Sequence, residues 1–223
     1  MKPGRDVIVV MAKSPAPGRV KTRMCPPLGR TQAASLAEAL LGDTVVAAQA
    51  TSASVWCAVS GSHALVAPLV GSSVRLFQQR GADLGQRLCA AQLAAFEAGA
   101  RRVLLLGADC PTAEGAYLTS ALRALDSADV VIGPARDGGY VLLATQRPTP
   151  QLFAGIDMGT PRVLRQTLVA AADSQGTVHI LPPRHDIDVA GDLQAALASG
   201  QLAEASRTRR WVSSEAGRAL SHT

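Results

Sequence analysis

The sequence predicts an α/β fold, a three-layer αβα sandwich around a mostly parallel but mixed sheet. Short runs of β-branched and other apolar residues alternate with longer segments of helical periodicity, which favours a sheet with helices on both faces. The runs at 7–11 and 103–107 are continuously apolar, as is typical of strands covered on both sides. Two closely spaced late runs, separated by Gly138 and Gly139, indicate that the sheet is mixed.

The first half of the chain opens with a strand and continues in alternating helices and strands. Two prolines and a glycine end the first strand within a few residues. In the helix that follows, Leu36, Leu40 and Val46 lie at helical spacing and are predicted to face the core. The elements predicted here are strand 7–11, helix 31–50, strand 55–59, helix 63–70, strand 74–77 and helix 84–98.

The second half repeats this alternation and ends in a helix. Its elements are predicted as strand 103–107, helix 113–125, strand 130–133, strand 140–144, helix 161–172, strand 178–181 and helix 190–198. From residue 201 onward the chain becomes polar and basic. We therefore expect residues 1–200 to form a single domain and residues 201–223 to form a peripheral tail.

Length and composition are those of one enzyme domain. A chain of 223 residues is long enough for a substantial core. No apolar run is long enough to span a bilayer, and the first residues lack the pattern of a secretory signal. The four cysteines are widely spaced, without a Cys-x-x-Cys pair, as is typical of reduced thiols. We therefore expect a cytoplasmic protein with no membrane partner.

The basic charge balance calls for anionic partners. The formal net charge is +5, but the arginines are dispersed and aromatic residues make up only 3% of the chain. A surface for stacking single-stranded nucleic acid is therefore not expected. A basic balance also suits small anionic substrates. We expect such substrates and no nucleic-acid partner.

The loop after the first strand concentrates positive charge. Lys13, Arg19, Lys21 and Arg23 follow the strand within a few residues. Ligands of open α/β sheets bind beyond the carboxyl ends of the strands, and a lysine neutralises phosphate as a compact point charge. The pattern favours a polyphosphate site; a solvated basic loop is the simpler alternative.

Aspartates follow the later strands. Asp109 comes directly after strand 103–107 and could hold a divalent cation or cap the next helix. Asp186 and Asp188 lie on the same face of an extended segment and could converge on one ion, although Asp188 could also start the last helix. Asp192 is expected on the helix surface or in a tertiary hydrogen bond.

Two glycine-containing segments are further candidates. Gly138 and Gly139 permit close approach of a ligand to the backbone, or form a plain turn between strands. In the segment 81–87, Asp83 is expected to cap a helix, and Arg87 is the more probable ligand contact of the two. The chain lacks the motifs of P-loop proteins, dinucleotide-binding folds and serine hydrolases.

Taken in order, the segments 13–23, 83–87, 107–111, 133–140 and 186–188 form a series with a known counterpart. The chain resembles a bacterial family of small GT-A-fold transferases, often labelled glycosyltransferases and akin to 2-phospho-L-lactate guanylyltransferases and MobA-like nucleotidyltransferases. The resemblance covers about 7–197 and implies the sandwich of nucleotide-diphospho-sugar transferases.

The same resemblance implies roles for individual residues. Lys21 and Arg23 would contact phosphates and act in catalysis together with Asp109 and Asp188. Mg²⁺ would be held by Asp109 and Asp188, with Asp186 beside them. The implied nucleotide-binding residues are Ala12, Lys13, Gly18, Lys21 and Arg87, and the implied acceptor-binding residues are Asp137, Gly138, Gly139 and Tyr140.

The resemblance is compatible with both nucleotidyl transfer and glycosyl transfer, and the residues favour nucleotidyl transfer. GT-A glycosyltransferases usually present two aspartates at the end of the middle strand, where this chain has Asp109 alone. A phosphate or phosphonate acceptor is already ionised and needs no general base, so alignment and charge neutralisation suffice. We therefore expect NMP transfer from an NTP, CTP or GTP, to a small anionic acceptor. A glycosyltransferase is the alternative, and a homodimer is an assembly that such sheets form.

Overall fold

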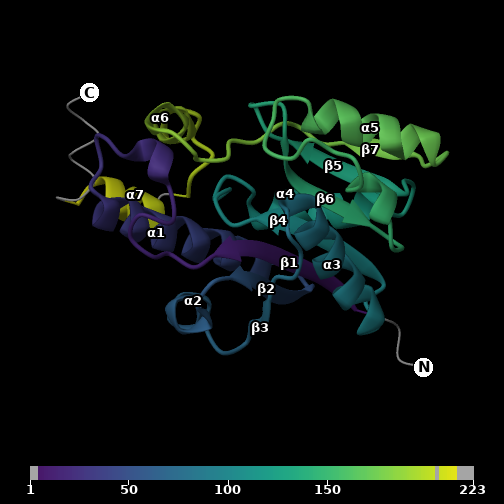
Figure 1. Ribbon diagram of the computed structural model, residues 1–223, viewed down its shortest axis with the longest axis horizontal. Coiled ribbons are helices and arrows are strands. Elements are labelled where there is room, and N and C mark those ends of the chain that lie inside the picture. Colours follow the sequence, from purple (N-terminus) through teal and green to yellow (C-terminus); the bar gives the residue numbers. More distant parts are fainter. Residues whose placement is uncertain (1–4, 204–205, 215–223) are drawn as a thin grey trace.

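The computed structural model describes residues 5–203 and 206–214 and confirms the predicted sandwich (Figure 1). Seven strands form one sheet in the order β3-β2-β1-β4-β6-β5-β7. β6 runs antiparallel to β4 and β5, whereas the other strand pairs are parallel. The sheet is therefore mixed, as the two closely spaced late strands indicated.

The elements follow the predicted order closely. The strands are β1 (Asp6–Lys13), β2 (Ser54–Ser60), β3 (Arg75–Gln78), β4 (Arg102–Gly107), β5 (Val130–Pro134), β6 (Tyr140–Thr145) and β7 (Val178–Ile180). The α-helices are α1 (Arg30–Gln49), α2 (His63–Val70), α3 (Leu84–Glu97), α4 (Gly115–Ala124), α5 (Val163–Asp173), α6 (Ala190–Ala198) and α7 (Arg207–Val212). Two short 3₁₀ helices, η1 (Thr22–Met24) and η2 (Pro150–Leu152), complete the described elements.

The continuous apolar runs arise because helices cover both faces of the sheet. Ile8 and Val10 of β1 belong to a core cluster with α1, α2 and α4 on one face. Val7 and Val9 belong to the cluster with α3 and α5 on the other face. Side chains alternate between the faces of a strand, so a strand with two buried faces needs apolar residues at every position.

One predicted core position is wrong. Leu36 and Leu40 of α1 are fully buried, but Val46 is 55% exposed. A helix turns about 100° per residue, so Val46 lies roughly 120° away from Leu40 around the helix axis. Val45 points to the core instead and is 1% exposed.

A third apolar cluster lies at one end of the molecule, where α6 and α7 lie beside α1 (Figure 1). It includes Met24 of η1, Leu36 of α1 and Trp211 of α7, together with Ile187 from the segment between β7 and α6. The predicted tail at 201–223 lies partly outside the described residues. In its described part, Trp211 is 8% exposed, and its Nε1 donates a hydrogen bond to Ser35 Oγ at 2.8 Å. This cluster therefore joins the start of the chain to its last described helix.

Within the described ranges, no helix is both long and apolar enough to cross a membrane. The four cysteines are free thiols, as expected from their spacing.

Candidate active site

The topology creates a crevice at the carboxyl ends of β1 and β4. The chain passes from β1 to β2 on one side and reaches β4 on the other, so the loops after β1 and β4 diverge at this point. Met11 of β1 pairs with Gly107 of β4, which brings the following residues of both strands side by side. A cavity of about 510 Å³ lies here, within the usual size range of small-molecule sites.

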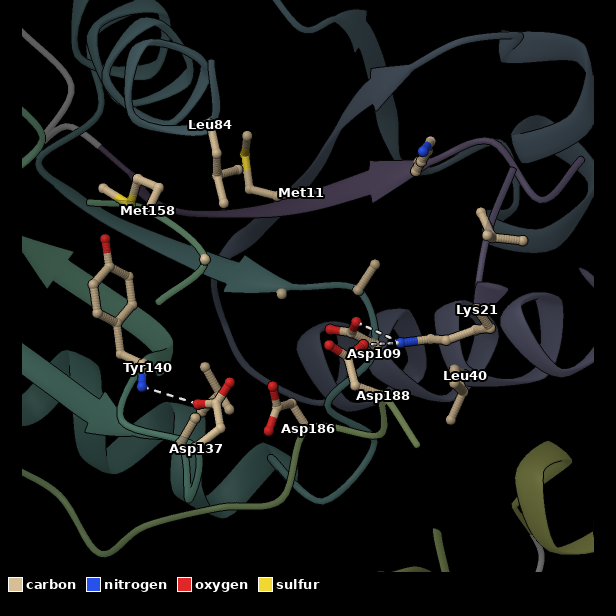
Figure 2. A pocket seen from close by; sticks show the side chains of 18 of the residues that line it. Met11, Lys21, Leu40, Leu84, Asp109, Asp137, Tyr140, Met158, Asp186 and Asp188 are labelled. Atoms are coloured by element: carbon tan, nitrogen blue, oxygen red, sulfur yellow. Dashed lines mark hydrogen bonds and ion pairs between the residues drawn. The ribbon is translucent and has the colours of Figure 1, made fainter. Parts of the chain in front are cut away.

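Lys21 is the central cation of this cavity. It precedes η1 in a left-handed backbone conformation, with φ 46° and ψ 36°. Its Nζ donates hydrogen bonds to Asp109 Oδ2 at 2.7 Å and to Asp188 Oδ1 at 2.8 Å (Figure 2). Arg23 is exposed, and its Nη1 lies 3.3 Å from Asp188 Oδ2. One ammonium group thus joins two carboxylates from distant parts of the chain.

Asp109 is positioned by the loop after β4. Thr44 Oγ1 of α1 donates to Ala108 O at 3.2 Å, and Ile187 N donates to Asp109 O at 3.0 Å. The alternative that Asp109 caps the next helix is wrong, because the N-cap residue of α4 is Glu114. The side chain of Asp109 is therefore available to the cavity.

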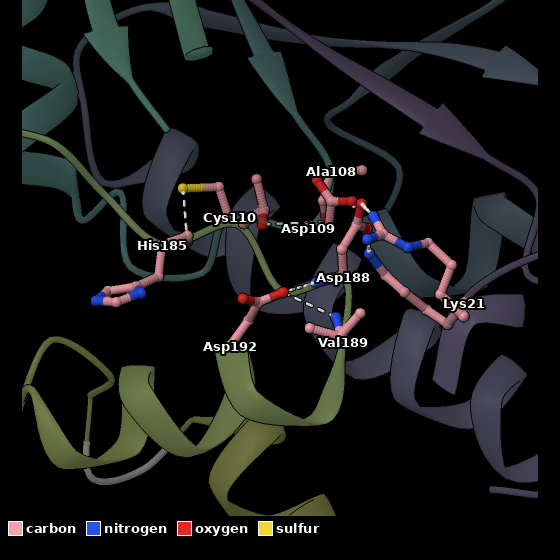
Figure 3. A network of polar contacts seen from close by, with 10 residues as sticks. Lys21, Ala108, Asp109, Cys110, His185, Asp188, Val189 and Asp192 are labelled. Carbon is pink, nitrogen blue, oxygen red and sulfur yellow. Dashed lines mark hydrogen bonds and ion pairs between the residues drawn. The ribbon is translucent and has the colours of Figure 1, made fainter. Parts of the chain in front are cut away.

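The segment after β7 brings the second group of aspartates to the same place. It is fastened to the loop after β4, because Thr112 Oγ1 donates to His185 O at 2.8 Å. At its far end, Asp192 Oδ2 accepts hydrogen bonds from the N–H groups of Asp188 at 2.9 Å and Val189 at 2.8 Å (Figure 3). The alternative that Asp188 caps α6 is wrong, because Val189 is the N-cap residue. Asp192 instead fixes the backbone on which Asp188 sits.

The ion pairs of Lys21 keep both the lysine and Asp188 in their charged forms. Lys21 is 8% exposed in its side chain, and burial opposes the charged form of its ammonium. The negative charges of Asp109 and Asp188 outweigh this effect and raise the pKa of Lys21. Burial also opposes the ionised form of Asp188, but Lys21 and Arg23 lower its pKa below the ordinary value. Lys21 and Asp188 are therefore both charged at neutral pH.

Asp186 has the opposite character. Burial, together with the negative charges of Asp137 and Asp109, raises the pKa of Asp186 to about 7. The charge of Asp186 therefore changes near neutral pH.

The loop between β5 and β6 forms the opposite wall. Asp137 Oδ1 accepts a hydrogen bond from Gly139 N at 2.9 Å and closes a tight turn. Gly138 has φ +91°, and a Cβ at this position would lie 2.4 Å from Pro161 O. Only glycine fits at position 138. The next two residues, Gly139 and Tyr140, line the cavity.

Most of the predicted site residues meet in this one cavity. Those that line it are Lys13, Lys21, Arg23, Asp109, Asp137, Gly139, Tyr140, Asp186 and Asp188. In the described part of the chain, Ala12, Gly18, Arg87 and Gly138 do not line it. Ala12 is buried and its carbonyl accepts from Gln79 Nε2 at 3.1 Å, whereas half-buried Arg87 donates from Nε to Gly81 O at 3.0 Å. Asp83 caps α3, as expected, by accepting from Gln86 N.

Sequence reasoning missed the apolar part of the lining. Met11, Leu84, Leu88, Met158 and Val163 also line the cavity. Met158 lies between η2 and α5 in a stretch without a recognisable motif, so no sequence signal marked it.

The donor set fits Mg²⁺. Two carboxylates already reach one cationic atom, so a cation at that position would contact both. Across residues 5–203 and 206–214, no group of three or more His, Cys, Asp or Glu side chains could hold a metal. The remaining ligands would be phosphates and water, a combination that Mg²⁺ accepts readily. Asp186 as a further ligand stays a prediction.

Comparison with solved structures supports the fold. A "putative nucleotide-diphospho-sugar transferase" from Desulfovibrio desulfuricans G20 is 28% identical, with a TM-score of 0.84 over 98% of this chain and 95% of that chain. Rv0371c from Mycobacterium tuberculosis H37Rv, in complex with manganese, is 16% identical, with a TM-score of 0.56 over 87% and 98% of the two chains.

A third structure is 4-diphosphocytidyl-2C-methyl-D-erythritol synthase from Anaerococcus prevotii DSM 20548. It is 12% identical, with a TM-score of 0.57 over 90% of this chain and 100% of that chain. All three structures share the GT-A-type sandwich of this chain. No curated protein matches the chain.

A protein-family comparison shows the family to which the chain belongs. The model described as "Uncharacterized protein conserved in bacteria (DUF2064)" matches residues 40–160, more than half of the chain. That range contains Asp109 and the loop with Asp137, so it includes two walls of the cavity. The protein is a member of the DUF2064 family.

Proposed function

We propose that the protein is a Mg²⁺-dependent nucleotidyltransferase. It would transfer NMP from an NTP, CTP or GTP, to a small acceptor that carries a phosphate or phosphonate. An ionised acceptor oxygen forms a bond to the α-phosphorus, the bond from the α-phosphorus to the bridging oxygen breaks, and pyrophosphate leaves. Kinship with the MobA-like nucleotidyltransferases and 2-phospho-L-lactate guanylyltransferases is part of this proposal.

The contact of Lys21 with Asp109 and Asp188 supports the proposal most. It brings a cationic loop and two carboxylates to one point beyond the strand ends, at 2.7 and 2.8 Å. Phosphoryl transfer depends mainly on alignment and on neutralisation of charge at the reacting phosphates. The residues at this point provide both positive charge and the ligands for a metal.

Each residue has a defined task in this proposal. Asp109 and Asp188 would hold Mg²⁺, which neutralises phosphate charge when bound. With the aspartates engaged in this way, the Lys21 ammonium would neutralise phosphate charge together with exposed Arg23. Lys13, at the end of β1, would extend the positive surface along the triphosphate. An already ionised acceptor needs no general base.

The first test is ligand stabilisation of the purified protein. Each of the four NTPs is added in Mg²⁺ or in EDTA, and the melting temperature is recorded. A nucleotide at a hundred times its Kd stabilises by roughly 2.7 kcal/mol, so we expect a clear increase for CTP or GTP in Mg²⁺ and little in EDTA. Stabilisation by no NTP would contradict the proposal.

Variants separate the metal from the fold. Asp109→Asn and Asp188→Asn should each remove the Mg²⁺-dependent stabilisation and the release of pyrophosphate with an accepted phosphonate. Asp173→Asn is the matched control, because Asp173 ends α5 and is exposed. Near-normal pyrophosphate release in either site variant would contradict the metal assignment.

A glycosyltransferase is the second candidate function. It is favoured by the similarity, at 28% identity, to a protein described as a nucleotide-diphospho-sugar transferase. Asp137 and Asp186 line the cavity and would be the carboxylates available to take a proton from an acceptor hydroxyl. Stabilisation by a nucleotide sugar and by no NTP would favour this function over nucleotidyl transfer.

A further inference from the structure

The two aspartates that would hold the metal lie on separate segments of the chain. Asp109 follows β4, and Asp188 lies between β7 and α6. Lys21 contacts both carboxylates at 2.7 and 2.8 Å, but it comes from a third segment, just before η1. In the proposed reaction its ammonium also neutralises phosphate charge. A direct link between the two aspartate segments would keep the carboxylates together independently of Lys21.

Two hydrogen bonds join these two segments directly. Ile187 N donates to Asp109 O at 3.0 Å. Thr112 Oγ1 donates to His185 O at 2.8 Å. Thr112 comes three residues after Asp109, and His185 comes three residues before Asp188. The two segments are therefore held together at two points close to the carboxylates, and one of these points depends on a single side chain.

Thr112 is placed to hold the site together and not to contact a ligand. It is 1% exposed and lies outside the lining of the cavity. It does not cap α4 either, because the N-cap residue of that helix is Glu114. Cys110 Sγ also contacts His185 O, at 3.4 Å (Figure 3), but a thiol is a weaker donor than a hydroxyl. Thr112 is therefore the stronger of the two side-chain donors to this carbonyl.

We propose that Thr112 is a positioning residue for the metal site. Its hydroxyl holds His185 and so determines where the segment of Asp188 lies relative to Asp109, and with it the separation of the two carboxylates. Side chains that orient metal ligands without touching the metal change affinity by about 10–100-fold when they are removed. This inference rests on the proposed function, which supplies the metal. The alternative is that Thr112 supports the fold alone.

Substitutions at position 112 separate the hydroxyl from the shape of the side chain. Thr112→Val replaces the hydroxyl with a methyl group in a side chain of similar shape, whereas Thr112→Ser keeps the hydroxyl. Mn²⁺ is titrated calorimetrically into the full chain without nucleotide. We expect Thr112→Val to weaken Mn²⁺ binding about tenfold and Thr112→Ser to retain most of the affinity. Equal weakening in both variants would contradict the proposal, because the hydroxyl would then not be the group that matters.

Thr145→Val is the matched control for stability. Thr145 is fully buried and accepts a hydrogen bond from Gln92 Nε2 at 3.0 Å. It pairs with Val103 near the start of β4, whereas Asp109 follows the other end of that strand. Urea denaturation should show lower stability in both valine variants, but Mn²⁺ affinity should decrease in Thr112→Val alone. The same Mn²⁺ affinity in both would mean that Thr112 supports the fold alone, and would overturn the proposal.

Amide hydrogen exchange in EDTA tests the position of the segment without a metal. Ile187 N–H donates to Asp109 O beside the Thr112 bond, so it should exchange several-fold faster in Thr112→Val than in Thr112→Ser or Thr145→Val. Equal exchange rates at Ile187 in the three variants would also refute the positioning role. Failure of the unsubstituted protein to bind Mn²⁺, with or without each NTP, would overturn the proposed metal-dependent function instead. The exchange rates would still decide whether Thr112 positions this segment.

Discussion

At the scale of single residues, Lys21 holds two like charges together. Asp109 and Asp188 come from opposite halves of the fold, and each lies within hydrogen-bonding distance of the same ammonium. The lysine does this from a left-handed backbone conformation, which is unfavourable for a residue with a Cβ. The unfavourable backbone conformation of Lys21 is therefore the cost of placing its ammonium between the two carboxylates.

This arrangement predicts competition between Lys21 and a metal. Lys21→Met removes the ammonium, so we expect Mn²⁺, used as the probe, to bind several-fold more tightly in the absence of nucleotide. Turnover should fall by about 100-fold or more, because a preorganised charge is lost. Lys13→Met should leave nucleotide-free Mn²⁺ binding unchanged. Calorimetric titration of Mn²⁺ checks both variants, and weaker binding to Lys21→Met would refute the competition.

Asp186 predicts how stability depends on pH. Its ordinary pKa of 3.8 is raised to about 7 in the folded protein, mainly by burial. Between these values the folded state keeps a proton that the unfolded state has released, so stability falls as pH increases across this window. The pKa of Asp188 is lowered below its ordinary value of 3.8. Asp188 therefore makes stability fall as pH decreases, in an acidic range that lies below the window of Asp186.

Asp186→Asn should therefore stabilise the metal-free protein more at pH 8 than at pH 5. Melting curves in EDTA at the two pH values measure the difference. Asp173→Asn, an exposed site at the end of α5, should show the same small effect at both. A pH-independent effect of Asp186→Asn would show that its carboxyl titrates normally.

The site also shows what sequence can and cannot reveal about single residues. Lys21, Asp109 and Asp188 follow strand ends or lie in a charged pattern, so their meeting was predictable from the rule that ligands bind at the carboxyl ends of strands. That Lys21 contacts both aspartates was not predictable, because it depends on the path of the loop. Met158 had no local signal, since its role comes only from the packing of its loop against the cavity.

At the scale of elements, the start of α6 determines the position of Asp188. Asp192 accepts hydrogen bonds from the N–H groups of Asp188 and Val189, so one carboxylate fixes both the helix and the site backbone. The sequence allowed a tertiary hydrogen bond for Asp192 and left open whether Asp188 caps the helix. The two alternatives differ only in backbone dihedral angles, which the residue types do not specify.

Asp192→Ala should reduce both stability and metal binding. Loss of the hydrogen bonds that Asp192 accepts at the start of α6 should cost about 0.5–2 kcal/mol, the range measured for helix capping, and the freed backbone no longer positions Asp188. Asp83→Ala is the matched control: Asp83 caps α3 through Gln86 N, so its loss should cost similar stability without changing Mn²⁺ affinity. Urea denaturation and Mn²⁺ titration separate the two effects. Equal Mn²⁺ affinity in both variants would exclude a positioning role for Asp192.

Prediction of elements succeeded where the pattern was long and failed where partners were distant. The strands and long helices were predicted because periodicity records which faces are buried. α7 has only 6 residues and is basic. Its first turn is held by Asp43 of α1, whose carboxylate accepts hydrogen bonds from Arg207 N and Thr208 N. Such a helix exists because of a residue far away in the sequence, which no local pattern shows.

At the scale of the whole molecule, the third apolar cluster connects the two sides of the site. Met24 follows the cationic loop, Ile187 lies between two candidate metal ligands, and Trp211 packs in the same cluster. Ile187 is fully buried, so the position of its neighbours depends on this packing. Residues 1–200 as one domain stay a prediction, and a domain of that kind would unfold in one cooperative transition.

Trp211→Ala should therefore weaken the site from a distance. Removal of a buried tryptophan costs about 3 kcal/mol or more, and here the hydrogen bond to Ser35 is lost as well. Because Ile187 loses part of its support, Mn²⁺ affinity should decrease in the variant while it is still folded. Trp56→Ala is the control, since Trp56 lies on β2 beside Arg75 and does not line the cavity. Urea denaturation followed by two spectroscopic probes, together with Mn²⁺ titration, measures both quantities. A Trp211→Ala protein that is less stable but binds Mn²⁺ normally would show that the cluster supports the fold alone.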